Sequence, residues 1–288
     1  MAIWNLGSIN ADYVYAVPHI PGPGETLAST KRDVFLGGKG ANMSVAAARA
    51  GAQVKHIGAV GKDGAWAEQT LLEYGVDTRH ITTLDTETAH AIIAVDANSE
   101  NMIILHPGAN VQIPQALLQN ALSEAETGDW FVTQNETNLQ RTGTQLARKM
   151  GLKVAYAAAP FDAERVEAVR EYLDFLILNA VEAEQLKAAT GKGPAELGIK
   201  DVIVTLGGDG ADWYGADGHQ HFDAIKVEPV DTTGAGDTFT GYVLAGLDRG
   251  MPMAQAINLA MKAGALMVMR QGTADVIPDL SEVQAFPS

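Results

Sequence analysis

The chain has 288 residues, of which 47% are hydrophobic, and it carries a formal net charge of −15 at pH 7 with no cysteine. This length suffices for one large α/β domain, the lack of cysteine excludes disulfides and thiolate metal sites, and the negative charge works against binding nucleic acid or an anionic membrane. No apolar run is long enough to span a bilayer and no N-terminal stretch has the form of a signal peptide, so we expect a cytoplasmic protein.

The N-terminal stretch is predicted to be a buried strand followed by polar residues. The strand covers residues 3–7, and Asn10 and Asp12 lie past its carboxyl end, where open α/β sheets bind ligands. Both side chains could bind one small polar ligand, with Asp12 accepting from two neighbouring hydroxyls, although an Asx turn leaving the strand would also explain them. Residues 13–17 and 28–35 are predicted to form strands of a small antiparallel excursion.

A glycine-rich turn, Gly37-Gly-Lys-Gly-Ala-Asn42, precedes a predicted helix over 43–50. Its glycines allow a ligand to approach the backbone closely, and Lys39 and Asn42 offer hydrogen-bond donors. The spacing is not that of a Walker A loop. The small residues of the helix also fit a purely structural reading, in which they let the helix pack tightly on the sheet.

The next segment is predicted to contain a strand at 54–60, a helix, and three further strands at 81–84, 89–95 and 101–106. The last two form a hairpin, and the three would join residues 12–35 in a second small sheet. The rest of the chain alternates helices and strands, which indicates a parallel sheet with helices on its faces and one domain over 1–288. The predicted helices are 114–125, 138–150, 164–172 and 180–189, and the strands after them are 130–134, 153–157, 175–178 and 201–205.

Two polar motifs lie at strand ends in this half. Asn179 and Glu182 have the i,i+3 spacing that sets both side chains on one face of a helix start. They could hold the water shell of a metal beside a phosphate, or simply form a capping box. The turn Thr205-Leu-Gly-Gly-Asp-Gly210 is a hairpin turn by default, and it contacts a nucleotide only if its neighbours supply the rest of a site.

The motif Asp231-Thr-Thr-Gly-Ala-Gly-Asp237 lies between a predicted strand at 224–230 and a predicted helix at 239–247. Gly234, Ala235 and Gly236 thus lie at a helix N-terminus, where unpaired N–H groups bind anions. Asp237 could accept the proton of an attacking hydroxyl, or could merely cap the helix. Because the helix N-terminus favours its charged form, we expect the pKa of Asp237 to be low.

Together these motifs resemble those of the ribokinase-like sugar kinases, a family that includes fructokinase and adenosine kinase, and within it the ribokinases most closely. The likeness covers nearly the whole chain. It implies an α/β fold with a mainly parallel sheet, helices on both faces, and a small antiparallel β lid formed by residues 12–35 and 89–106. In ribokinases that lid also pairs two subunits, so a homodimer is implied. The motifs that carry the likeness are Gly7-Ser-Ile-Asn-Ala-Asp12, Gly37-Gly-Lys-Gly-Ala-Asn42, His106-Pro-Gly-Ala-Asn110, Asn179-x-x-Glu182, Thr205-Leu-Gly-x-x-Gly210 and Asp231-Thr-Thr-Gly-Ala-Gly-Asp237.

The resemblance also implies a role for each motif. Asp237 would be the catalytic base, and the N–H groups of Gly234, Ala235 and Gly236 would form an anion hole. Asn179 and Glu182 would serve phosphate and Mg²⁺, with Glu182 acting through water. The sugar would contact Asn10, Asp12, Gly38, Lys39, Asn42 and Glu136, and the nucleotide would contact Thr205, Gly207 and Gly210.

Members of this family often hold a monovalent cation, usually K⁺, beside the anion hole. Val276 stands where a hydroxyl-bearing residue often completes that site, so cation dependence is expected to be weak or absent. Leu178 and Ala157-Ala158 also depart from the family pattern, near the metal. The matching carbonyls for the cation are those of Asp231, Thr233, Met267, Arg270 and Gly272.

The implied activity is ATP-dependent transfer of the γ-phosphoryl group to the primary hydroxyl of a small sugar, with D-ribose to ribose 5-phosphate as the leading reaction. Fructose, 2-keto-3-deoxygluconate and nucleosides remain alternative substrates, because the pair Asn10 and Asp12 discriminates little among vicinal diols. A second alternative is a non-catalytic regulator that binds a sugar or a nucleotide. Asp237 argues against this alternative, since a binding protein needs no base.

Overall fold

The structure is a computed structural model that describes residues 1–98 and 100–287. Its main sheet has nine strands in the order β13-β12-β11-β10-β9-β8-β1-β4-β5. The strands from β11 to β5 run parallel, and β12 and β13 continue the sheet antiparallel at one edge. The bounds are β1 Ala2–Leu6, β4 Gln53–Gly61, β5 Asp77–Leu84, β8 Trp130–Gln134, β9 Lys153–Ala157, β10 Phe175–Asn179, β11 Asp201–Thr205, β12 Ala211–Gly215 and β13 Gly218–Phe222.

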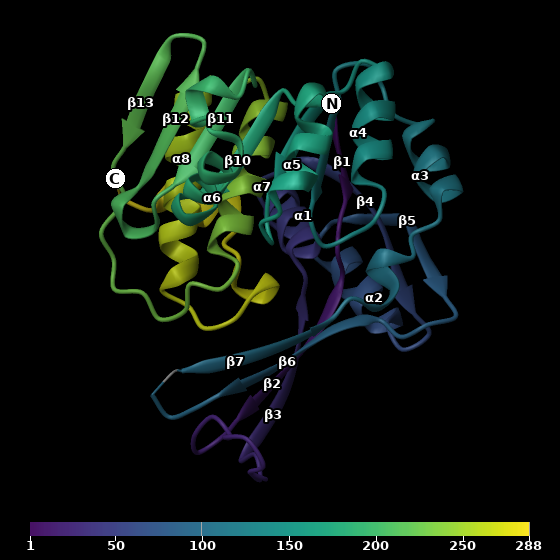
Figure 1. Cartoon of the computed structure of the whole chain (residues 1–288), viewed down its shortest axis with the longest axis vertical. Coiled ribbons are helices and arrows are strands. Elements are labelled where there is room, and N and C mark those ends of the chain that lie inside the picture. Colours follow the sequence, from purple (N-terminus) through teal and green to yellow (C-terminus); the bar gives the residue numbers. More distant parts are fainter. Residues whose placement is uncertain (99, 288) are drawn as a thin grey trace.

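Helices cover both faces of this sheet, as the sequence predicts (Figure 1). Successive strand residues point to opposite faces, so Ile3 joins one core cluster while Trp4 and Leu6 join the other. One face packs against α1 Lys39–Arg49, α2 Ala65–Glu73, α7 Ala235–Asp248, α8 Met253–Val268 and α9 Leu280–Ala285, and the other against α3 Gln115–Leu122, α4 Gln140–Lys149, α5 Ala163–Val169 and α6 Ala180–Thr190.

A second sheet projects from the carboxyl edge of the first (Figure 1). It consists of β3 Lys31–Gly37, β2 Asn10–Ala16, β6 Ala89–Val95 and β7 Asn101–His106, in that order. Its two outer pairs are antiparallel, as predicted, but the central pair β2–β6 is parallel. The reason is that β2 continues from β1 and β6 from β5, and these two strands run in the same direction.

One predicted strand was assigned to the wrong sheet, and another does not form. Residues 81–84 belong to β5 in the main sheet, where they pair with β4, and not to the small sheet. Residues 224–230 form no strand, because the ladder between β12 and β13 already ends at the pair Ala211 and Phe222 and leaves them no partner strand. They instead form a loop along a cavity at the carboxyl edge.

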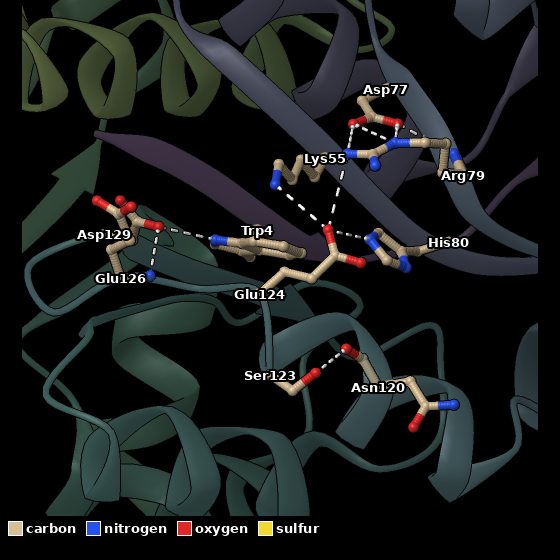
Figure 2. Close-up of polar contacts among 10 residues, drawn as sticks. All are labelled: Trp4, Lys55, Asp77, Arg79, His80, Asn120, Ser123, Glu124, Glu126 and Asp129. Atoms are coloured by element: carbon tan, nitrogen blue, oxygen red, sulfur yellow. Dashed lines mark hydrogen bonds and ion pairs between the residues drawn. The ribbon is translucent and has the colours of Figure 1, made fainter.

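A polar cluster ties the β1–β4–β5 end of the sheet to the loops around α3 (Figure 2). Trp4 donates from Nε1 to Asp129 Oδ2 at 3.0 Å, and Lys55 Nζ lies 4.2 Å from the centre of the Trp4 ring. The carboxylate of Glu124 lies within 4 Å of Lys55, Arg79 and His80. No helix in the described part of the chain is long and apolar enough to cross a membrane.

Candidate active site

The predicted site residues meet at the carboxyl edge of the main sheet. Parallel strands end on the same side, so the residues that follow β1, β8, β10 and β11 come close together there. The helices α1 and α7 pack side by side on one face, and their N-termini lie at the same edge. The two glycine-rich motifs, 195 residues apart, therefore belong to one site, where Asn42 bonds to Asp237.

The helix N-terminus at α7 has the geometry that the sequence predicts for an anion site. Gly234 is the N-cap with φ 75°, a conformation that favours glycine. Ala235 N donates to Thr232 O at 3.2 Å, but the N–H groups of Gly236 and Asp237 have no protein acceptor among the described residues. The predicted anion hole therefore gains the N–H of Asp237, while that of Ala235 is engaged in the turn.

Asp237 does not cap this helix, since no side chain caps α7. Its side chain is buried, and Oδ2 accepts a hydrogen bond of 2.9 Å from Asn42 Nδ2. Burial raises the pKa of Asp237 to about 6, and the charge of Lys39 and the bond from Asn42 only partly oppose this. The expected low pKa was wrong because desolvation of the carboxylate outweighs the favourable charges around it.

Polar groups from several segments converge beside Asp237. Glu136 Oε2 accepts from Ser8 Oγ at 2.5 Å and from the backbone N of Lys39 at 3.0 Å. Asn10 Oδ1 accepts from Asn110 Nδ2 at 2.8 Å. Ser8 and Asn110 had no predicted role, although both lie inside the quoted motifs.

Two of the predicted sugar-site residues carry strongly perturbed charges. Burial and the neighbouring charge of Glu136 raise the pKa of Asp12 to about 7, while Lys39 partly lowers it. The pKa of Lys39 is raised mainly by Asp237, with burial opposing and Glu136, Glu182 and Asp12 adding to the effect. One cation thus lies among four carboxyl groups, an arrangement that can bind the hydroxyls of a polyol.

Two adjacent cavities open at this edge. The first, of about 250 Å³, is lined by Lys39, Glu182 and Asp237. The second, of about 460 Å³, is lined by Gly207, Gly210 and mostly apolar side chains of the 224–229 loop and of α7 and α8. Both cavities share four lining residues, which are Asn179, Thr205, Thr232 and Gly236.

Comparison with known proteins agrees with this geometry. A model described as "pfkB family carbohydrate kinase" matches residues 3–280. The chain is 34% identical to the ribokinase of Haemophilus influenzae, with 98% of this chain and 96% of that protein covered. The ribokinase structure from Thermotoga maritima superposes with a TM-score of 0.89 at 31% identity, covering 99% and 98% of the two chains. The ribokinase of Cryptococcus neoformans in complex with ADP gives 0.85 at 32% identity, with 98% of each chain covered.

The chain belongs to the pfkB family of carbohydrate kinases. It is therefore an ATP-dependent sugar kinase, and the ribokinase-like fold inferred from the motifs is confirmed. The relatives extend over nearly the same length as this chain.

In this pfkB kinase, Asn179 and Glu182 form the capping box that the sequence offered as one alternative. Asn179 Oδ1 accepts from Glu182 N at 2.9 Å, and Glu182 Oε2 accepts from Asn179 N at 2.7 Å. Glu182 nevertheless lines the smaller cavity, and burial raises its pKa. Within residues 1–98 and 100–287, no group of three His, Cys, Asp or Glu side chains could by itself hold a metal ion.

The two segments predicted to flank a monovalent cation lie next to each other in this kinase. Asp231 accepts at Oδ1 from Thr233 N at 2.9 Å and at Oδ2 from Gly272 N at 3.4 Å. The carbonyl of Met267 already accepts from Arg270 N at 2.9 Å. Arg270 also donates a 3.3 Å bond to the carbonyl of Val276.

Proposed function

We propose that this kinase phosphorylates the terminal hydroxymethyl group of D-ribose to give ribose 5-phosphate. The main support is the set of polar side chains next to Asp237, in which Asp12, Lys39 and Glu136 surround a space for a small polyol. The 34% identity to a ribokinase over nearly the full length supports the same substrate. Fructose, 2-keto-3-deoxygluconate and nucleosides remain the alternatives, because a site of this kind discriminates poorly against an added group.

In the proposed reaction, the sugar hydroxyl oxygen attacks the γ-phosphorus of ATP while the bond to the bridging oxygen of ADP breaks. The hydroxyl proton passes to Asp237, which Asn42 holds in place by its 2.9 Å hydrogen bond. With a pKa of about 6, Asp237 is ionised at pH 7.5 and is a stronger base than an ordinary carboxylate. The free N–H groups of Gly236 and Asp237 stabilise the charge on the phosphoryl group in transfer.

For the nucleotide side, we propose that the larger cavity takes the base of ATP and the smaller one its terminal phosphates. Thr205 lines both cavities, and Gly207 and Gly210 line the larger one, so these three residues would contact the nucleotide. Oxygen donors suit Mg²⁺, which keeps several waters and the phosphates of its nucleotide as ligands. Glu182 fits such an ion through a water, since this partly buried residue lines the smaller cavity. A bound Mg²⁺ would neutralise charge on the phosphates.

A monovalent cation beside the anion hole is proposed to matter little in this kinase. The support is that Val276 offers no hydroxyl and that the carbonyl of Met267, one of the five, already accepts a hydrogen bond. Each remaining carbonyl oxygen of the set retains a lone pair, so weak binding of K⁺ fits the residues present.

The cytoplasmic location of this kinase likewise remains a prediction.

The small sheet is proposed to act as a lid over the sugar and to pair two copies of this chain. One row of residues runs across all four strands in register and faces away from Asp12, and it consists of Val34, Tyr13, Ile92 and Ile104. Three of the four are exposed apolar side chains, with exposed fractions of 37%, 39% and 55% for Val34, Ile92 and Ile104. An apolar surface across a sheet favours burial against an identical copy.

The test of the substrate is to compare kcat/KM for ribose, fructose, 2-keto-3-deoxygluconate and adenosine under one set of conditions. Ribose is expected to rank first. If ribose ranks below another substrate by about tenfold, roughly 1.4 kcal/mol, the ribose assignment fails while the kinase assignment survives. Absence of sugar-dependent ATP consumption with every compound would instead favour a sugar-binding regulator.

A further inference from the structure

Four polar side chains lie buried beneath the proposed sugar site and take no part in the reaction described above. They are Asn5 of β1, Ser44 of α1, His56 of β4 and Gln134 of β8, each at most 1% exposed. Burying polar groups in a core brings little net stability, and apolar residues of the same shape would serve the core equally well. Their presence in one place therefore calls for another explanation.

The four side chains form one directional chain of hydrogen bonds. Gln134 Nε2 donates to Asn5 Oδ1 at 2.9 Å, and Asn5 Nδ2 donates to Ser44 Oγ at 2.8 Å. Ser44 Oγ lies 2.8 Å from His56 Nδ1, and His56 Nε2 lies 3.1 Å from the carbonyl oxygen of Gly7. Because a carbonyl can only accept, Nε2 carries the proton, and Nδ1 accepts from the Ser44 hydroxyl. Complete burial lowers the pKa of His56 to about 4, so the ring is neutral.

The chain of bonds ends on two backbone carbonyls, those of Gly7 and Gly40. His56 holds the first, and Asn5 Nδ2 holds the second at 2.8 Å. The two glycines touch, since a Cβ built on Gly7 would lie 2.6 Å from the Cα of Gly40. Any movement of one segment must therefore displace the other.

The residues next to these glycines carry the proposed sugar site. Gly40 N donates to Ser8 Oγ at 3.1 Å, and Ala41 N donates to Ser8 O at 2.8 Å. Ser8 and the backbone N of Lys39 both donate to Glu136. The segment after Gly7 leads to Asn10 and Asp12, and the segment around Gly40 holds Lys39 and Asn42.

We propose that His56, with Ser44 and Asn5, is a positioning residue that fixes these two segments relative to each other and so sets the affinity for the sugar. Buried polar side chains with directional bonds define one arrangement of the backbone, which apolar contacts do not. The inference depends on the proposed function only in taking Asn10, Asp12, Lys39 and Glu136 as the sugar site. It does not depend on which sugar is the substrate.

The first experiment compares His56→Phe with His56→Gln. Phe fills a similar volume but removes the acceptor of the Ser44 hydroxyl proton and leaves the Gly7 carbonyl unpaired, whereas Gln can accept from Ser44 and donate to Gly7. The assay uses the sugar that the unmodified enzyme phosphorylates best. His56→Phe is expected to raise the sugar KM roughly tenfold or more, with kcat and the KM for ATP within about twofold. His56→Gln should recover most of the loss.

The triple variant Asn5→Val, Ser44→Ala, His56→Phe separates positioning from stability. It removes three buried polar side chains together and takes one hydrogen-bond partner each from Gln134 and from the carbonyls of Gly7 and Gly40, so its Tm is expected to stay closer to that of the unmodified enzyme than the Tm of His56→Phe does. Its sugar KM should remain raised despite this stability. A folded triple variant with the original sugar KM would overturn the inference, and so would equal losses in the KM for ATP and for sugar. Failure of the function itself would show in the unmodified enzyme, before any variant is compared.

Discussion

The proposed sugar side and the proposed nucleotide side of this site differ in the residues that line them. On the sugar side, charged side chains are buried close together, and the pKa of both Asp12 and Asp237 is raised by burial. On the nucleotide side, a cavity of about 460 Å³ is lined by glycines and apolar residues such as Phe239, Met261 and Val268, with Lys226 at its edge. The first region can recognise hydroxyls through paired hydrogen bonds, and the second recognises shape.

This difference predicts how each region responds to substitution. On the proposed sugar side, removing one charged partner leaves the remaining charged groups buried and unpaired, which should lower affinity or stability. On the nucleotide side, only a change of volume or of backbone should matter. The predictions below test this contrast, from the largest expected effect to the smallest.

Asp237→Asn should lower kcat roughly 100-fold or more, because an amide cannot accept the hydroxyl proton, while both KM values change little. Steady-state kinetics with each substrate varied would measure this. The matched control is Asp248→Asn at the other end of α7, whose carboxyl also has a raised pKa through burial but lies far from the cavities. Near-native kcat for Asp237→Asn would remove this residue from the chemistry.

The same substitution should stabilise the fold. The pKa of Asp237 is about 6 in the folded state against 3.8 for an ordinary aspartate, so the folded protein binds this proton more tightly than the unfolded chain. The buried charge therefore costs stability above pH 6, and the cost disappears as the pH falls through 6 toward 4. A neutral Asn removes a cost of at most roughly 3 kcal/mol, so Tm at pH 8 should rise. An unchanged Tm would mean that Lys39 fully compensates the charge.

Asp12→Asn should raise the sugar KM on the order of 100-fold and leave the KM for ATP within about twofold. The amide keeps the shape but loses one of the paired acceptors for two neighbouring hydroxyls. A suitable control is Asp33→Asn on the adjacent strand β3, where the carboxylate pairs with Lys31 at 2.7 Å on the surface. Equal effects of the two substitutions would point to a general change in the lid.

Gly264→Leu should raise the KM for ATP about tenfold without changing the sugar KM. Gly264 lines the larger cavity from α8, and a Cβ placed on it meets no atom within 4 Å, so a leucine would extend into the space for the base. Gly264→Ala is the control, since it adds only the Cβ and should stabilise the helix by about 1 kcal/mol. If the leucine variant binds ATP normally, the base lies elsewhere.

The pH dependence should differ between the two substrates. Asp12, with a pKa of about 7, must lose its proton to accept from two sugar hydroxyls at once, so kcat/KM for the sugar should fall roughly tenfold between pH 8 and pH 6. At saturating sugar and ATP, kcat should fall only near pH 6, where Asp237 becomes protonated. In Asp12→Asn the inflection near pH 7 should vanish. An inflection that persists there would belong to another group.

Exchange of K⁺ for tetramethylammonium should change the rate less than about tenfold, or roughly 1.4 kcal/mol. Val276 supplies no side-chain oxygen, which is the reason for this small effect. Val276→Ser is the comparison variant, because it adds the side-chain hydroxyl that position 276 lacks. A steep, saturable K⁺ requirement in the unmodified enzyme would show that backbone carbonyls suffice.

Local sequence was sufficient to predict most helices, the two glycine turns and the family. The glycine at position 234 needs a positive φ, and the N–H groups beyond it must be free, so the anion site follows from the motif itself. The alternation of apolar residues predicted a strand at 224–230, but a strand needs a neighbouring strand to pair with. Whether a neighbour is available depends on where β12 ends. For the same reason the assignment of residues 81–84 to one sheet or the other could not be read locally.

Only the tertiary structure determines the pKa values of the site residues and which buried side chains hold those residues in place. Motif chemistry indicated a low pKa for Asp237, because a helix N-terminus favours the carboxylate. Burial decides otherwise, and burial is a property of everything that packs around a residue. His56 is an ordinary strand residue in the sequence, and it contacts Ser44 and Gly7 only because β1, β4 and α1 pack together. The sequence determined which groups are present, and long-range packing determined which of them are charged and which hold the others in place.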